Sequence, residues 1–439
     1  MNIPRTPSSP AALFRASLAL ALFAAPALAQ SSQDAPLDAG TVAPGPSLLD
    51  EIDAAAGQPV KTSPAGPVAP VVPPPQQNPI ARAFQSLNPD VSAIVDGDVG
   101  YFSAAPYSLA GDDPELRGPH SEHPAGFAVQ EVEVALQAVV DPYLRGDVFL
   151  TIPNLSGLEV EEAMLTTTGL PGGLQVKAGT FRSAFGRQNG QHLHLQDFTR
   201  RPLINEAFLG GDGLRAPGLQ LSWLVPVPFF LQWSAEAFSV GPPDDATHLT
   251  SFGGGKRTDL TYTTELKFFA PATEALSIYG GLNAATGLSA SNTTGFIVAV
   301  PHTRTVLEGA DLYVKYKPPN VSGSYFSLAW TTEYFLRELP ELGQTDGGLY
   351  TQLVLQLARR LFVGVREDLL GVPSTALQPR VQRTSLSVTF ALSEFARLRL
   401  YGERETQPAS GTGVFGGPES WAALLQVEAS IGAHGAHPF

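Results

Sequence analysis

The chain has 439 residues, a formal net charge of −14, 43 glycines, 39 prolines and no cysteine. Without cysteine, disulfide bonds and thiolate metal sites are excluded. The acidic balance argues against nucleic acid as a partner, because a negatively charged surface repels phosphates.

Residues 1–29 have the pattern of an export signal. Arg5 and Arg15 give a positive start, residues 13–28 form an apolar stretch, and Ala27-Leu28-Ala29 is a small-x-small cleavage site. The alternative is a membrane anchor, but the apolar stretch is short and a Pro-rich segment follows it. We therefore expect this segment to be cleaved as the protein leaves the cytoplasm.

Residues 30–87 are rich in Pro, Ala, Ser and Gly. This composition cannot bury a core, so it predicts a mostly disordered tether in the periplasm. Farther along, no segment has the roughly 18 unbroken apolar residues that a membrane helix needs. The candidate at residues 216–225 is interrupted by Gln220 and Ser222.

From residue 88 to residue 439 the chain repeats a period of two. Val132 and Val134, for example, alternate with Glu131 and Glu133. Each run has about ten residues, enough for a tilted strand to cross a hydrocarbon layer. A soluble sandwich also alternates, but its strands are usually shorter. The pattern predicts an all-β fold, a transmembrane antiparallel β-barrel of about 16 strands.

The connections between these runs alternate in length. Tight turns such as residues 141–143 and 318–320 are followed by longer segments such as 241–258 and 339–347, with a short exception at 154–157. Short turns at one end and long loops at the other are typical of outer-membrane barrels. The run at residues 159–170 is ambiguous, because Glu162 falls on its apolar face.

Residues 187–213 form the longest break between two predicted strands. A loop of this length is either functional or disordered. We expect it to lie in or over the mouth of the barrel and to narrow the pore. Its candidate constriction residues are Arg187, Asp197, Arg200, Arg201, Glu206 and Asp212.

The polar face of the predicted strands carries both signs of charge. Charges on a lipid face are costly, so they belong in a wet lumen. The pore-lining candidates are Glu131, Glu133, Arg145, Asp147, Lys177, Glu236, Glu265, Lys267, Asp311, Lys315, Glu333, Arg366, Arg397 and Arg399. One interpretation is plain solvation of a polar wall. The other is a weakly selective channel with a mild preference for cations.

Six histidines occur in pairs at close spacing: His120 with His123, His192 with His194, and His434 with His437. Two rings on one side of an extended stretch could hold zinc or copper. Two ligands are not a complete site, however, and exposed loop histidines without metal are the alternative. We therefore expect no resident cofactor, with zinc binding as the open possibility.

The sequence has no Gly-x-Ser-x-Gly elbow and no His-Glu-x-x-His motif, so we expect no enzymatic activity. The last alternating run, residues 421–431, and the terminal Phe439 are typical of outer-membrane proteins, in which this end serves the barrel assembly machinery.

Several stretches resemble a known family: residues 86–95, 130–143, 177–187, 201–203 and 432–437. Together they resemble bacterial proteins labelled zinc-regulated TonB-dependent outer membrane receptors and, more loosely, the porin superfamily that includes phosphate-selective porins. The first label implies zinc-linked expression and energised uptake, whereas the Pro-rich segment before the barrel does not resemble the plug of a TonB-dependent transporter. The porin resemblance implies a homotrimer.

The leading hypothesis is a porin-like channel in the bacterial outer membrane, surrounded by lipid and lipopolysaccharide, that passes small solutes or ions. One alternative is a plugless receptor for the uptake of zinc or a metal complex. Another is a structural or adhesive surface barrel.

Overall fold

The structure of the protein is a computed structural model. It describes residues 90–103, 126–153, 155, 157–241, 251–253, 256–289, 303–319, 325–375, 378–406 and 419–432. The predicted export signal and tether (residues 1–87) lie outside the described residues. So do His120, His123, His434, His437 and Phe439.

The described part of the chain contains sixteen strands. In chain order they are β1 (Asp90–Phe102), β2 (Gly126–Asp141), β3 (Leu144–Pro153), β4 (Glu159–Thr167), β5 (Leu174–Arg182), β6 (Arg215–Leu224), β7 (Phe230–Phe238), β8 (Thr261–Pro271), β9 (Leu276–Leu288), β10 (Arg304–Tyr316), β11 (Ser327–Leu339), β12 (Gln344–Ala358), β13 (Leu361–Leu370), β14 (Val381–Ala391), β15 (Ala396–Thr406) and β16 (Glu419–Gly432). Four short helical segments accompany them: η3 (Pro171–Gly173), η4 (Leu193–Leu195), α4 (Leu203–Leu209) and η5 (Pro340–Leu342). Among the described residues, no helix combines the length and the apolar character needed to cross a bilayer.

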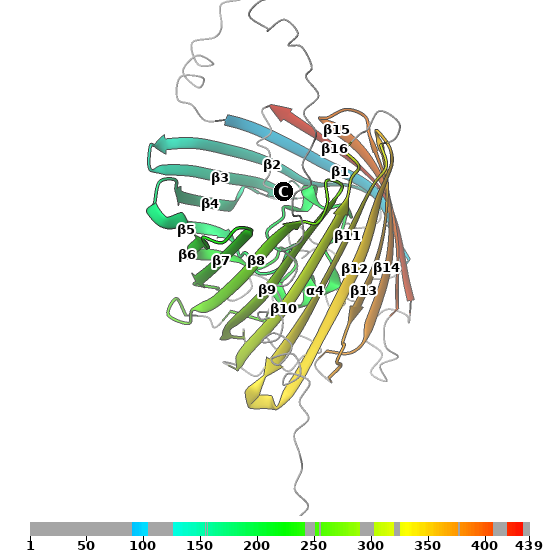
Figure 1. Ribbon diagram of the computed structural model, residues 1–439. Helices are drawn as coiled ribbons and strands as arrows, with labels where there is room; N and C mark the ends of the chain where they lie inside the picture. The colour runs from blue at the N-terminus through cyan, green and yellow to red at the C-terminus, as the bar shows by residue number, and fades with distance from the viewer. Residues whose placement is uncertain are drawn as a thin grey trace, which may run out of the picture. The chain divides into compact units, whose positions relative to one another are not determined.

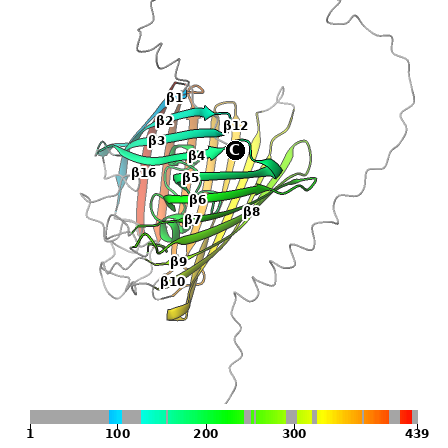
Figure 2. The same ribbon diagram turned by 90° about the vertical axis from the view of Figure 1, so that its left-hand side faces the viewer.

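Each strand pairs with its neighbours in sequence, and β1 pairs antiparallel with β16 to close the barrel (Figures 1 and 2). The predicted closed antiparallel barrel of about 16 strands is confirmed. The TonB-dependent label is not supported, because such transporters have barrels of about 22 strands.

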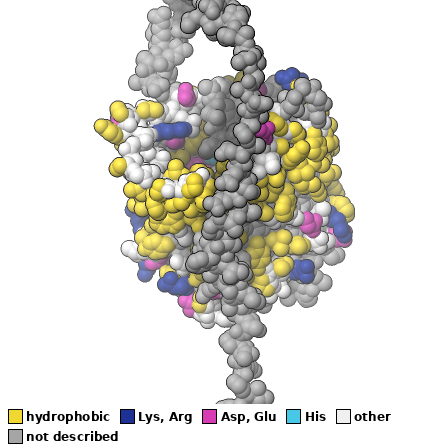
Figure 3. Space-filling model, in the orientation of Figure 1, with side chains coloured by type: hydrophobic (Ala, Val, Ile, Leu, Met, Phe, Trp, Pro, Cys, Tyr) yellow, Lys and Arg dark blue, Asp and Glu magenta, His cyan; other side chains and the backbone are white. Residues whose placement is uncertain are grey.

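The barrel is apolar outside and polar inside. On β15, Leu400 is 57% exposed on the outer face, whereas the adjacent Arg399 is 1% exposed toward the interior. All four tryptophans, Trp223, Trp233, Trp330 and Trp421, are also partly exposed, and Figure 3 shows apolar side chains gathered in a band over the strands. A water-soluble sandwich would bury these apolar side chains, so this outer face is suited to hydrocarbon.

Connections at one end of the barrel are short, as at residues 142–143, 359–360 and 392–395. One expectation about the other end is wrong. Residues 339–347 do not form a long loop, because β11 and β12 continue to pair as far as Leu339 and Gln344, leaving only η5 between them.

Leu400 lies midway along β15, so its replacement by arginine tests the lipid-facing assignment. We expect Leu400→Arg to lower the free energy of unfolding in lipid vesicles by about 2–4 kcal/mol, because a charge would enter the middle of the apolar layer. The matched control is Leu392→Arg, which lies in the turn after β14 and should cost about 0–1 kcal/mol. Equal costs in a denaturant titration would contradict the assignment.

Candidate functional site

The connection between β5 and β6, residues 183–214, folds into the barrel and is here called the inner loop. It contains η4 and α4, and α4 lies inside the ring of strands in Figure 1. The segment is therefore ordered and partly helical. Its hydrogen bonds reach strands on opposite sides of the barrel, from β7 to β15.

An apolar cluster holds one side of the inner loop against the wall. α4 contacts β11, β12 and β13. The cluster consists of Phe185, Leu203, Ile204, Phe208, Leu209 and Leu214 from the loop, with Phe252, Ala285, Leu307, Phe335, Tyr350, Leu370 and Val381 from the rest of the barrel. Burying a leucine or phenylalanine side chain contributes about 1.5–3 kcal/mol, so this cluster is a major source of loop stability.

Acidic side chains of the wall accept hydrogen bonds from backbone N–H groups of the loop. Glu236 on β7 accepts from Ala184 at 3.0 Å. Glu333 on β11 accepts from Arg187 at 3.1 Å and from Gln188 at 2.8 Å. In the same way, Asp368 on β13 accepts from the N–H of Leu203 at 3.0 Å. These carboxylates satisfy buried donors that would otherwise lose their hydrogen bonds to water.

Arginines of the wall donate to the loop's backbone carbonyl groups. Arg366 on β13 donates to the Arg200 oxygen at 2.9 Å and Arg399 on β15 to the Gln196 oxygen at 2.7 Å. Two further donors are Arg383, which reaches the Arg201 oxygen, and Arg397, which reaches the His194 oxygen. Acids of the wall thus satisfy N–H groups of the loop backbone, and arginines of the wall satisfy its C=O groups.

Asn189 joins the two ends of the inner loop and is fully buried. Its side-chain nitrogen donates to the carbonyl oxygens of Ser183 at 2.8 Å and Leu214 at 3.1 Å. Its side-chain oxygen accepts from the Leu214 N–H at 2.7 Å.

A β-bulge places two successive carboxylates in the interior on β4. The pairing of β3 with β4 shifts between Phe149, opposite Glu162, and Leu150, opposite Val160. The extra residue is Glu161, so Glu161 and Glu162 are both buried. Bulges re-aim side chains in this way. This explains why Glu162 did not fit the alternation in the sequence.

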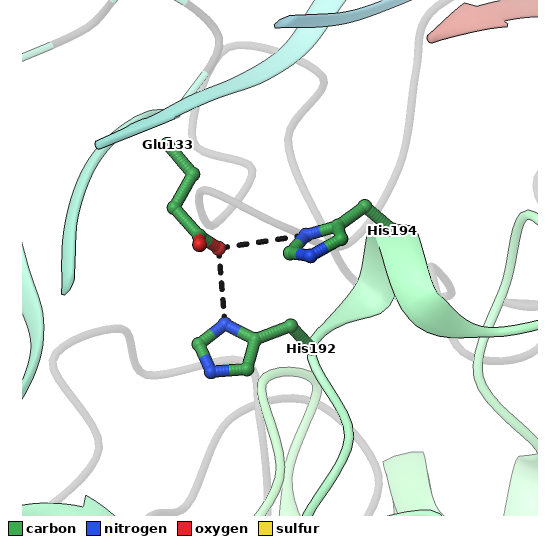
Figure 4. Close-up of side chains that lie close together, drawn as sticks. All are labelled: Glu133, His192 and His194. Carbon is green, nitrogen blue, oxygen red and sulfur yellow. Dashed lines mark hydrogen bonds and ion pairs between the residues drawn. The ribbon is translucent and has the colours of Figure 1, made fainter. Parts of the chain in front are cut away.

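These carboxylates belong to a buried group that we call the histidine cluster. It comprises Glu131, Glu133, Glu161, Glu162, Arg182, His192 and His194. In Figure 4 both imidazole rings point toward the Glu133 carboxylate. His192 Nδ1 lies 3.0 Å from Glu133 Oε2, and His192 Nε2 lies 3.0 Å from Glu162 Oε2.

The charges around His192 favour its protonated form. Burial opposes a charged ring, but the carboxylates of Glu161 and Glu133 outweigh burial and hold the pKa of His192 well above its usual range. The Phe149 ring lies 4.8 Å from the imidazole, centroid to centroid, and covers it. The ring is therefore fixed in position by carboxylates on two strands and by an aromatic neighbour.

No protein-family model matches the sequence. A protein of Aquifex aeolicus (strain VF5) that bears only the name "Uncharacterized protein" is 32% identical over 350 residues, covering 72% of this chain and 70% of that protein. The chain belongs to the same family as this Aquifex aeolicus protein.

Two solved porin structures have a fold similar to that of this chain. An anion-selective porin from Comamonas acidovorans matches with a TM-score of 0.50 and 13% identity, covering 78% of this chain and 99% of that one. Pseudomonas putida OprB, in its high-pH structure, matches with a TM-score of 0.52 and 11% identity, covering 80% and 96%. At these identities the likeness shows the shared fold.

The structure divides the pore-lining candidates of this family member into groups. Eight are buried. Six of these contact the inner loop through hydrogen bonds or ion pairs: Glu131, Glu133, Glu236, Glu333, Arg366 and Arg399. The other two, Glu265 and Asp147, form ion pairs with the more exposed Lys267 and Arg145. Lys177, Asp311, Lys315 and Arg397 remain partly exposed in the interior.

The predicted constriction residues also separate. Asp197 is exposed and Arg187 is half-buried over the Tyr313 ring, 3.8 Å from its centroid. The other four form ion pairs: Arg200 with Glu403, Glu206 with Arg383, and Asp212 with Arg182, Arg215 and Arg201. Of the three predicted histidine pairs, only His192 and His194 lie within the described residues.

Several residues of the site were not among the predicted ones. Glu162 and Arg182 belong to the histidine cluster, and Asn189 joins the two ends of the inner loop. The signal for Glu162 was present, because two adjacent glutamates in an otherwise alternating strand indicate a bulge. Nothing local marked Asn189, whose partners lie 6 and 25 residues away.

Asn189→Ala should loosen the inner loop without disturbing the barrel. The substitution removes three buried hydrogen bonds, each worth about 1 kcal/mol. We expect the opening free energy of the loop, measured by hydrogen exchange of its amides, to fall by about 3 kcal/mol. Gln191→Ala, in the same loop, is the control and should leave protection unchanged. Undiminished protection in the Asn189 variant would show that the loop is held in another way.

Proposed function

We propose that the protein is a channel of the bacterial outer membrane that passes small solutes or ions passively, with the inner loop narrowing its lumen. The observation that carries this proposal is the combination of an apolar outer face with a charged interior in one closed barrel. A barrel packed as a core would carry apolar side chains inside, whereas a charged interior suits a water-filled lumen and a loop that lies within it. The porin fold of the Comamonas acidovorans and Pseudomonas putida neighbours agrees with it.

The space left beside the inner loop supports passage of small solutes. A cavity of about 300 Å³ lies between Asp197 of the loop and the wall formed by β12 to β16. Polar side chains line much of it, among them Ser387, Thr389, Arg397 and Glu428. Its volume is at the low end for small-molecule sites, so the loop would limit the size of the solute.

Among the charged side chains that remain exposed in this lumen, cationic ones predominate. The wall acids Glu133, Glu236 and Glu333 are engaged with the inner loop, and among the described residues Lys177 and Lys315 have no ion-pair partner at contact distance. The charges of Arg399, Arg397, Arg187 and Lys315 all act on Asp197. We therefore propose a weak preference for anions, in place of the mild cation preference suggested by the sequence.

Shortening the inner loop should enlarge the pore. We expect that replacing residues 189–212 by a short Gly-Ser linker raises single-channel conductance in planar bilayers, because most of the segment that narrows the lumen is removed. A linker of the same composition inserted at Gly343, in the turn between β11 and β12, is the control and should leave conductance unchanged. If the shortened loop gives wild-type conductance, the narrowing role is wrong.

The preference for anions can be measured as a reversal potential in a salt gradient. We expect Lys177→Gln/Lys315→Gln to shift the reversal potential toward cation selectivity, because rings of charge bias ion passage. Arg360→Gln, in the turn between β12 and β13, is the control and should have no effect. A wild-type channel with strong cation selectivity would overturn this part of the proposal.

A purified barrel that inserts into bilayers but never conducts would favour the structural or adhesive alternative over a channel.

A further inference from the structure

Three ligand atoms from two separate parts of the chain converge in the histidine cluster. Glu133 Oε2 lies 3.0 Å from His192 Nδ1 and 3.4 Å from His194 Nδ1. One ligand atom from each of the three residues lies within 4.8 Å of the others. We propose that Glu133, His192 and His194 bind a divalent transition-metal ion of the zinc class. This proposal does not depend on the channel function.

The two distances from Glu133 to the imidazole nitrogens fit a small tetrahedral ion. Zinc bonds to imidazole nitrogen and carboxylate oxygen measure about 2.0–2.2 Å, so neighbouring ligand atoms in a tetrahedron lie about 3.3 Å apart. The distances of 3.0 and 3.4 Å from Glu133 lie on either side of this value. Imidazole with carboxylate suits zinc and related transition metals better than magnesium or calcium, which prefer oxygen ligands alone.

A second observation concerns the far side of the His192 ring. His192 Nε2 lies 3.0 Å from Glu162 Oε2, and the other oxygen of Glu162 accepts the backbone N–H of Arg182 at 2.5 Å. A metal-binding histidine almost always donates its other N–H to a carboxylate or carbonyl group in this way. When Nδ1 binds the metal, Nε2–H would donate to Glu162 and hold the ring in that orientation.

Further carboxylates lie within reach of the same position. Glu161 Oε2 is 3.3 Å from His192 Nδ1, and Glu131 Oε1 is 3.5 Å from His194 Nδ1. Either oxygen could supply a fourth ligand. Four carboxylates, Glu131, Glu133, Glu161 and Glu162, thus surround the two rings. Such surroundings favour a divalent cation over an uncharged ligand.

The burial of the site indicates what the metal would do. Glu133, His192 and His194 are 2%, 5% and 1% exposed. A solute in the lumen would not meet an ion held so deeply, so the site does not act as a station on the pathway. It connects η4 of the inner loop to β2, and Glu162 connects it to β4. The metal would clamp the loop to the wall opposite α4.

The test uses the purified full chain in detergent, stripped of metal by a chelator, with zinc chloride as the probe. We expect calorimetric titration to show that the wild type binds a zinc ion and that His192→Ala/His194→Ala does not bind it. X-ray absorption of the zinc-loaded wild type should show two imidazoles among nitrogen and oxygen ligands. Matched controls are His120→Ala/His123→Ala and His434→Ala/His437→Ala, which should retain this ion.

Glu162→Gln gives an independent readout, because it leaves all three ligands in place. Loss of an outer carboxylate partner typically weakens metal affinity 10- to 100-fold, and we expect a decrease in that range. The proposal is overturned if the wild type binds no zinc, or if its absorption spectrum shows no imidazole. It is equally overturned if the double histidine variant, shown to be folded by its strand circular dichroism, binds zinc as the wild type does. Should that variant not fold, the wild-type absorption spectrum decides.

Discussion

The structure depends on one constraint: a long loop inside a barrel has backbone N–H and C=O groups that have lost much of their access to water. The inner loop cannot form a sheet with the wall, because the wall strands are already paired on both edges. Charged side chains therefore supply the hydrogen bonds that strand pairing would otherwise provide. Carboxylates such as Glu333 and Asp368 accept its N–H groups, and arginines such as Arg366 and Arg399 donate to its carbonyl groups.

This requirement explains why both signs of charge occur along the interior. A wall evolved only to attract one kind of ion would carry mainly one sign, whereas a wall that holds a backbone needs donors and acceptors. Hydrogen bonds to charged groups contribute about 1.5–3 kcal/mol each, so the loop is held firmly. In the proposed channel, only the charges left partly or fully exposed, such as Lys315 and Asp197, would act on a passing solute.

The barrel could be predicted from the sequence because its period of two is local and repeated. Outward and inward positions such as Leu400 and Arg399 follow from neighbouring residues alone. The position of the inner loop could be predicted from its length. Its path could not, because its partners lie as far as 227 residues away in sequence, as for Thr199 and Gln426. The His192–His194 pair could be identified from the sequence. Its carboxylate partners could not, because they depend on the register of β2 and on the bulge in β4.

The central claim is that the inner loop lies in a conducting lumen, and Asp197 is the residue at which to test it. The chain has no native cysteine, so Asp197→Cys introduces a unique thiol at an exposed position bordering the cavity. A bulky, membrane-impermeant thiol reagent added during a planar-bilayer recording should reduce the current irreversibly, while the cysteine-free wild type is unaffected. A thiol that is fully modified with no change in current would contradict the account.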